Sequence, residues 1–230
     1  MSTMNLAAKP YFDQADLQGV DDVLLALENL GHNLPQKQLA MLDNFNKTYL
    51  IITRNVRQQL RKGAFEHPDF LHQFDTRFAY YYLRALKGYL QNQEIPRAWR
   101  RAFRTARHRY ASPFVCMALG VNAHVNNDIA QVLRDCKATK QHYRDYRLVN
   151  SIIKDSLDEV IDLFRGQDRL LSPHRRLLRP IFKAGMAQLV KIWRFTAWRK
   201  FRKLQRRELS VPRLETRADK VGKGIAKLPI

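Results

Sequence analysis

Apolar residues recur at spacings of three and four along most of the chain, which is the pattern of amphipathic helices. Leu17, Val20, Leu24 and Leu27 give one example, and Pro35 follows them as a break. The pattern predicts helices over residues 13–30, 39–60, 69–90, 97–110, 112–136, 142–164 and 177–209. No strand-like alternation is long enough to compete. We therefore predict an all-α fold, a single-domain helical bundle of about six to seven helices.

The length of the chain indicates one domain. A chain of 230 residues, 45% of them hydrophobic, can bury one sizeable core and does not require two. The predicted helices all lie within residues 1–209. Residues 210–230 contain two prolines and two glycines among scattered charges. We therefore expect a helical domain over 1–209 and a basic, mobile tail over 210–230.

The charge of the chain is strongly positive and uneven. There are 41 Lys and Arg residues against 21 Asp and Glu residues, a net charge of +20. Residues 169–230 hold 18 of the basic and 3 of the acidic residues, so this part alone carries +15. Such an excess attracts polyanions, which are nucleic acid, anionic lipid or an acidic protein.

The stretch 191–207 combines basic and aromatic residues at helical spacing. Its apolar positions include Ile192, Phe195, Trp198 and Leu204. The predicted anion-binding surface consists of Arg194, Arg199, Lys200, Arg202, Lys203, Arg206 and Arg207. A basic amphipathic helix with Trp and Phe is typical of lipid interfaces, and it also suits a phosphate backbone. The alternative is a core helix whose outer face is solvated.

Cysteine content and hydropathy bear on location. Cys116 and Cys136 form neither a disulfide framework nor a zinc motif, which favours a reducing compartment. The N-terminus has no apolar run of signal-peptide length, and no stretch approaches the length of a membrane span. We therefore expect a cytoplasmic protein. If the basic stretch binds lipid, the protein would be peripheral at the inner membrane face.

The segment 120–130 places polar residues inside an otherwise apolar helix. His124 and Asp128 are four residues apart, and Asn127 lies three from His124, so all three share a face. A His and a carboxylate in this register can bind a divalent metal or act as an acid/base pair on a small-molecule substrate. The alternative is structural: Asp128 accepts a hydrogen bond from His124, and the asparagines link helices.

Two further aspartates complete the predicted site. Asp75 lies on an aromatic helix face, where a bare carboxylate is costly and requires a partner. Asp145 lies near the start of the helix predicted over 142–164, where capping the helix N-terminus is the alternative role. The predicted metal ligands are His124, Asp128, Asp75 and Asp145. The predicted catalytic residues are His124, Asp128 and Asn127.

Several spaced elements resemble a bacterial family of helical proteins of unknown function. They are Gly120-x-Asn-Ala-His-x-Asn-x-Asp128, Arg77-Phe78 with Tyr82-Leu83-x-Ala85-Leu86, Asp145-Tyr146 with Val149-Asn150, and Ala197-Trp198. The resemblance covers roughly residues 70–200 and implies a helical fold with no established activity. The His-x3-Asp element is also similar to one part of the helical zinc phospholipase C and P1 nuclease sites. The remaining histidines of that pattern are absent from this chain.

Two functions from different classes remain open. The first is a small-molecule enzyme, a metal-assisted hydrolase, with the interior His, Asp and Asn residues as its site. The second is a non-catalytic protein that docks on an anionic membrane or nucleic acid through its basic C-terminal helix. Common motifs for nucleotide binding, zinc proteases and serine hydrolases are absent from the sequence.

Overall fold

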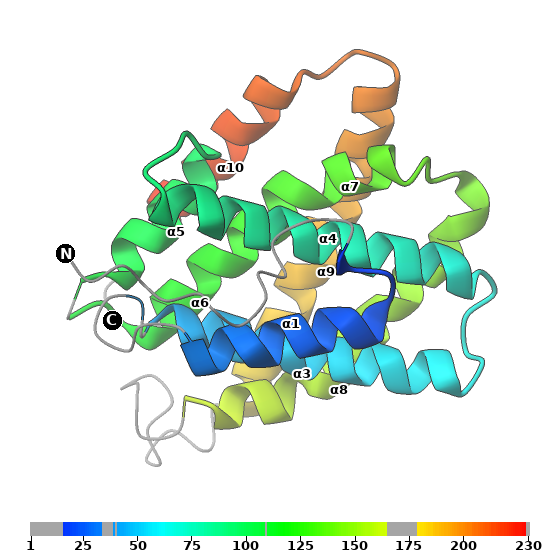
Figure 1. Ribbon diagram of the computed structural model, residues 1–230, viewed down its shortest axis with the longest axis horizontal. Coiled ribbons are helices and arrows are strands. Elements are labelled where there is room, and N and C mark those ends of the chain that lie inside the picture. Colours follow the sequence, from blue (N-terminus) through cyan, green and yellow to red (C-terminus); the bar gives the residue numbers. More distant parts are fainter. Residues whose placement is uncertain (1–15, 34–38, 40, 109, 165–178, 229–230) are drawn as a thin grey trace.

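The computed structural model describes residues 16–33, 39, 41–108, 110–164 and 179–228 (Figure 1). Its helices are α1 (Val20–Asn33), α3 (Leu42–Arg61), α4 (Pro68–Leu90), α5 (Arg97–Ala106), α6 (Pro113–Asn122), the π-helix η2 (Ala123–Asp128), α7 (Ile129–Asp135), the short 3₁₀-helix η3 (Lys140–His142), α8 (Tyr143–Asp162), α9 (Arg179–Gln205) and α10 (Val211–Ile225). The described residues contain no strand, which confirms the predicted all-α class.

The described helices number eight when α6, η2 and α7 are counted as one continuous helix and the three-residue η3 is left out. This is slightly more than the predicted six to seven, because residues 210–230 add α10. The predicted helix starts at residues 13 and 177 lie outside the described residues. No helix in the described part of the chain combines the length and the apolar character needed to cross a bilayer.

Local sequence signals determine where several helices begin and end. The Ser112 hydroxyl accepts a hydrogen bond from the Val115 N–H at 3.3 Å, and Pro113 occupies the first turn of α6. Gly63, two residues after the end of α3, has φ of +67°, a left-handed conformation that glycine adopts without strain. Both boundaries lie within one residue of the helix limits predicted at residues 60 and 112.

The continuous helix α6–η2–α7 runs through the middle of the bundle. The η2 segment contacts α4, α5, α9 and α10, and α6 contacts α3 and α5. Close approach to α3 depends on Gly120, because a Cβ at this position would lie 2.6 Å from the ring of Phe45. Figure 1 shows α9 running across the other long helices, up to the turn that leads into α10.

The expectation of a mobile tail over 210–230 is wrong for its described part. Val211–Ile225 forms α10, which packs on α5, α6 and η2. Leu214 and Ala218 are fully buried there. Asn122 donates from Nδ2 to the Ala218 carbonyl at 3.0 Å, and Arg101 forms an ion pair with Asp219 at 2.8 Å. These partners come from distant parts of the chain, so composition alone does not reveal them.

Candidate functional site

The central helix changes its hydrogen-bonding pattern where the polar residues lie. Residues 123–128 form a π-helix between α6 and α7, and all six are buried. A π-helical segment widens the turn, and such segments are frequent at functional sites. Within it, His124 Nδ1 lies 3.0 Å from Asp128 Oδ2. The predicted contact between these two side chains is therefore present.

Asp128 is fully buried, and three side chains donate hydrogen bonds to it. Trp99 Nε1 donates to Oδ2 at 2.9 Å, and Asn127 Nδ2 donates to Oδ1 at 2.8 Å. His124 Nδ1 lies 3.0 Å from the same Oδ2 and donates to it in the tautomer that carries its proton on Nδ1. Three donors on one carboxylate offset part of the cost of burying its charge.

Aromatic rings pack against the His124 ring from several directions. It stacks on Phe78 with ring centroids 3.4 Å apart, and the rings of Phe45 and Tyr49 meet it edge-on. Burial lowers the pKa of His124, and the bond to Asp128 opposes this shift. The imidazole is therefore neutral at pH 7. With Nδ1 protonated, Nε2 carries a lone pair, and it has no hydrogen-bond partner among the described residues.

The same histidine lines an apolar cavity of about 140 Å³. Side chains of α3, α4, α6, α8 and α9 form its walls, and almost all of them are aliphatic or aromatic. Besides His124 Nε2, three buried polar atoms on its lining residues lack a partner within the described structure: Tyr49 OH, Thr53 Oγ1 and Asp75 Oδ2. Buried polar groups are normally paired, so four unpaired atoms on residues that line one apolar cavity single out this part of the core as the candidate site.

Asp75 faces the same cavity from α4. Burial raises the pKa of its carboxyl to about 7, and no cation among the described residues contributes to the shift. The side chain is therefore protonated in a large fraction of molecules at neutral pH and can donate a hydrogen bond. The partner expected for Asp75 is not found among the described residues, and protonation of the carboxyl lowers the cost of its burial instead.

Asp145 does not join this cluster. Its carboxylate accepts hydrogen bonds from the backbone N–H groups of Glu66 at 3.0 Å and His67 at 2.7 Å, just before α4. Among the described residues, the only three potential metal ligands within 4.8 Å of one another are Glu66, His67 and Asp145. His124, Asp128, Asp75 and Asp145 are thus not assembled as one ligand set. The similarity to the zinc phospholipase site remains a prediction.

The asparagines of the motif have structural partners. Asn126 Nδ2 donates to Asn122 Oδ1 at 3.1 Å, and Asn122 in turn binds the backbone of α10. Gln131 donates to the Asn127 carbonyl. Asn122 therefore links the central helix to α10, as the structural alternative predicted, and Asn126 supports Asn122 from the same helix. Asn127 instead holds the Asp128 carboxylate.

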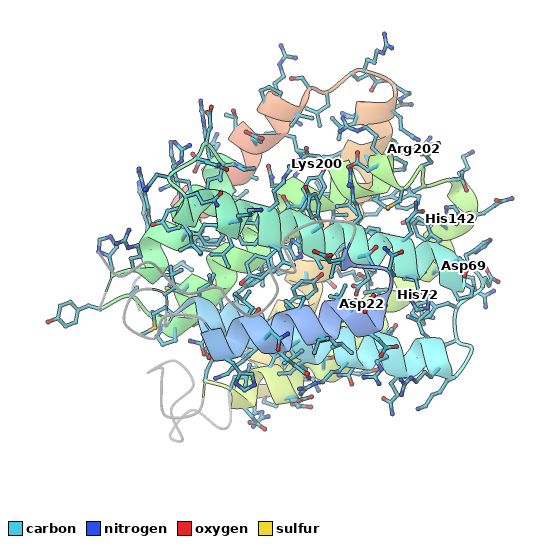
Figure 2. All side chains as sticks on the ribbon, viewed as in Figure 1. Asp22, Asp69, His72, His142, Lys200 and Arg202 are labelled. Atoms are coloured by element: carbon cyan, nitrogen blue, oxygen red, sulfur yellow. The ribbon has the colours of Figure 1, made fainter. Side chains whose placement is uncertain are left out.

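The residues of the predicted anion-binding surface differ in how exposed they are. Arg199, Arg202, Lys203, Arg206 and Arg207 are exposed. Lys200 is partly buried, donates to the Asn126 carbonyl at 3.5 Å, and has a pKa lowered by burial to about 8. Figure 2 labels Lys200 and Arg202 near the end of α9 that adjoins α10. Arg194 is only 3% exposed, so its assignment to a surface is wrong.

A second hollow lies between the start of α1 and α4 and is lined by polar residues, including Asp22, Asp69 and His72 (Figure 2). Two of its polar side chains accept hydrogen bonds from backbone N–H groups. Asp22 accepts from the N–H groups of Gln18 and Gly19, and His72 Nδ1 accepts from that of Val20. This hollow is therefore explained by capping of α1.

Sequence reasoning missed Trp99, Tyr49 and Thr53. Trp99 lies in a short basic helix, and a buried indole N–H requires an acceptor. That requirement was the available signal, since Asp128 is a buried acceptor. Tyr49 and Thr53 lie one turn apart on an apolar helix, and nothing in the sequence marks their hydroxyls as unpaired.

Comparison with known proteins gives one finding. A family model described as "Family of unknown function (DUF5995)" matches residues 20–228. The match extends through α10, which agrees with the packing of α10 on the bundle. No curated protein and no solved structure was found to match the chain.

Proposed function

Because the chain belongs to this family of unknown function over residues 20–228, we propose a function from the site itself: general acid–base catalysis on a small, largely apolar molecule. The observation that carries the proposal is the buried His124–Asp128 pair beside the cavity, in which Asp128 fixes Nδ1 and Nε2 is left without a partner among the described residues. An imidazole oriented by a buried carboxylate, with its second nitrogen free, is the arrangement of a general base.

The residues around the cavity have distinct roles in this proposal. His124 Nε2 takes a proton from a water molecule, and Asp128 stabilises the imidazolium that forms. The Asp75 carboxyl donates a hydrogen bond to the oxygen atom that gains negative charge when water adds to a carbonyl group. The proton on His124 then passes to the leaving group. This sequence describes hydrolysis of a small ester or amide.

A metal-assisted form of the same reaction has less support. Both Asp128 oxygens already accept hydrogen bonds, which leaves His124 and Asp75 as ligands at the cavity. Metal-assisted hydrolases usually hold the ion with three protein ligands. The acid–base chemistry proposed here needs no metal ion, so activity should persist after dialysis against EDTA.

The test is hydrolysis of p-nitrophenyl esters of varied acyl size, including esters whose acyl chain ends in a carboxylate. His124→Ala should lower kcat/KM by about 10²–10⁴-fold, the usual contribution of a general base. His108→Ala is the matched control, because His108 is exposed outside the site. Equal activity of His124→Ala and wild type would exclude His124 as the base.

A second function, docking on an anionic lipid surface, is favoured by α9. Ile181, Ile192 and Phe195 on this helix are 71%, 49% and 50% exposed. Spacings of 11 and 14 residues place them on one side of a helix, and exposed cations such as Arg199 and Lys203 continue that side. Exposed apolar residues beside cations suit an anionic bilayer better than nucleic acid.

Vesicle flotation distinguishes these partners. Phosphatidylglycerol vesicles should bind the protein, phosphatidylcholine vesicles should not, and salt should weaken binding. The double variant Ile192→Ser, Phe195→Ser should lose binding, whereas Leu25→Ser, at an exposed leucine of α1, should not. A gel shift with nucleic acid in the absence of vesicle binding would favour the nucleic-acid alternative.

A further inference from the structure

Arg194 is a buried cation at the wall of the cavity. It lies on α9, 3% exposed, among the residues that line the cavity. Nε donates to Asn150 Oδ1 at 2.7 Å, and Nη2 donates to the Tyr146 carbonyl at 2.8 Å. The guanidinium carbon lies 4.2 Å from the centroid of the Tyr146 ring. These contacts fix the guanidinium in one orientation.

The charge of Arg194 has no counter-charge in the described structure. No Asp or Glu of the described ranges forms an ion pair with it, and its two hydrogen-bond acceptors are neutral amide and carbonyl oxygens. Burial lowers the pKa of the guanidinium, and no described carboxylate counteracts that shift. Burying a cation without a counter-charge is costly. The charge of Asp128, by comparison, is stabilised by three hydrogen-bond donors.

The other polar groups of the cavity cannot supply the missing charge. Asp75, the carboxyl that lines the same cavity, shows no interaction with Arg194, and it is protonated in a large fraction of molecules at pH 7. The Tyr49 and Thr53 hydroxyls are neutral. No described carboxylate neutralises Arg194, and the cavity beside it is where a small molecule can bring an anion.

We infer that the cavity binds a small amphiphilic monocarboxylate, with its apolar body among the aliphatic and aromatic walls and its carboxylate on Arg194. One guanidinium matches one carboxylate in charge and in geometry. A cavity of about 140 Å³ resembles in size an engineered protein cavity of about 150 Å³ that holds benzene. The body is therefore the size of a phenyl ring or a short alkyl chain.

This inference rests on the proposed function in taking the cavity as the substrate site, and it names the substrate class. The carboxylate on Arg194 would anchor the substrate, while the bond that reacts lies at His124. The anchor does not take part in the proton transfers. Arg194 is thus a binding residue, and its role can be measured without turnover.

The experiment measures binding of matched pairs by calorimetry: hexanoate against 1-hexanol, and phenylacetate against 2-phenylethanol. Wild type should bind each acid at least about tenfold more tightly than its alcohol, a modest effect for a charge-assisted contact. Arg194→Met should remove that preference and keep alcohol binding. Arg199→Met, at an exposed arginine of the same helix, should keep the preference.

Alcohol binding also reports whether Arg194→Met is folded, because Arg194 supports Asn150 and Tyr146. If that variant fails to fold, the wild-type comparison still decides: equal affinity for acid and alcohol overturns the inference. His124→Ala should lose turnover and retain the acid preference. Acid preference without any turnover would refute the proposed catalysis alone, and turnover without acid preference would refute the carboxylate anchor alone.

Discussion

At the scale of single residues, Asp128 and Asp75 are two buried carboxyl groups with opposite solutions to burial. Asp128 keeps three donors around its oxygens, whereas Asp75 has an orphaned oxygen and a pKa raised by burial to about 7. The first therefore suits orientation of a base, and the second suits donation of a proton or hydrogen bond. Similar pairs of carboxyl groups divide acid and base roles in many enzymes.

Asp128→Asn tests the role of the first carboxyl. An amide offers one acceptor oxygen where three donors converge, so the free energy of unfolding should fall by about 1–3 kcal/mol. It also removes the charge that fixes the His124 tautomer, so kcat per folded molecule should fall by up to about 10⁴-fold. Thermal melts and kinetics on the same sample separate the effects. Unchanged kcat with a lower melting temperature would make Asp128 purely structural.

Asp75→Asn tests the second carboxyl through pH. Its pKa rises from 3.8 in a solvated chain to about 7 in the fold, so the folded state holds the proton more tightly. Stability from this group is present below about pH 4 and is lost as pH rises to about 7. Relative to wild type, Asp75→Asn should gain stability between pH 5 and pH 8, by at most about 4 kcal/mol. Urea melts at both pH values measure this, and a pH-independent difference would contradict it.

At the scale of helices, the π-helix and its neighbours determine where the catalytic candidates point. The central helix approaches α3 so closely at Gly120 that Phe45 occupies the space of a Cβ. Phe45 in turn meets the rings of Trp99 and His124 edge-on. The helix–helix distance and the orientation of the imidazole are therefore coupled through one aromatic ring.

Gly120→Ala should disturb both fold and site. The added methyl group must displace the buried Phe45 ring, and overpacking of this kind costs about 1–3 kcal/mol. Displacement of Phe45 should also lower activity beyond the loss of folded protein. Gly224→Ala is the control, because a Cβ there meets nothing within 4 Å. Equal melting temperatures for the two variants would show that the contact relaxes at no cost.

At the scale of the whole molecule, the strong positive charge of the chain lies mainly outside the candidate site. The net charge is +20, yet the site is neutral or acidic apart from Arg194. Several cations form surface ion pairs, as between Arg57 and Asp21 at 2.7 Å. Such pairs contribute little each, so repulsion among the remaining cations should lower the stability of the folded chain.

Salt should therefore stabilise the protein. Raising NaCl from 20 mM to 500 mM shortens the range of repulsion, and a gain of about 1 kcal/mol would raise the melting temperature by about 2–4 °C at this chain length. The triple variant Arg199→Gln, Arg202→Gln, Lys203→Gln should show a smaller rise. A melting temperature that falls with NaCl would indicate that attractive ion pairs outweigh the repulsion.

The sequence by itself determined the helical class, most helix boundaries and the pairing of His124 with Asp128. These follow from local rules: apolar periodicity, capping by Ser112, the left-handed Gly63, and the reach of side chains four residues apart. The basic character of α9 was likewise evident, because charge is a property of composition.

Only the tertiary structure decided which groups meet across helices. It brought Trp99 to Asp128, joined Asp75 to the His124 cavity, placed Asp145 at the start of α4, buried Arg194, and packed α10 on the bundle. Helix periodicity gives a residue's face but not the helix opposite it, and the pKa of a buried carboxyl depends on those opposing groups. Contacts between distant parts of the chain therefore fixed the chemistry of this site.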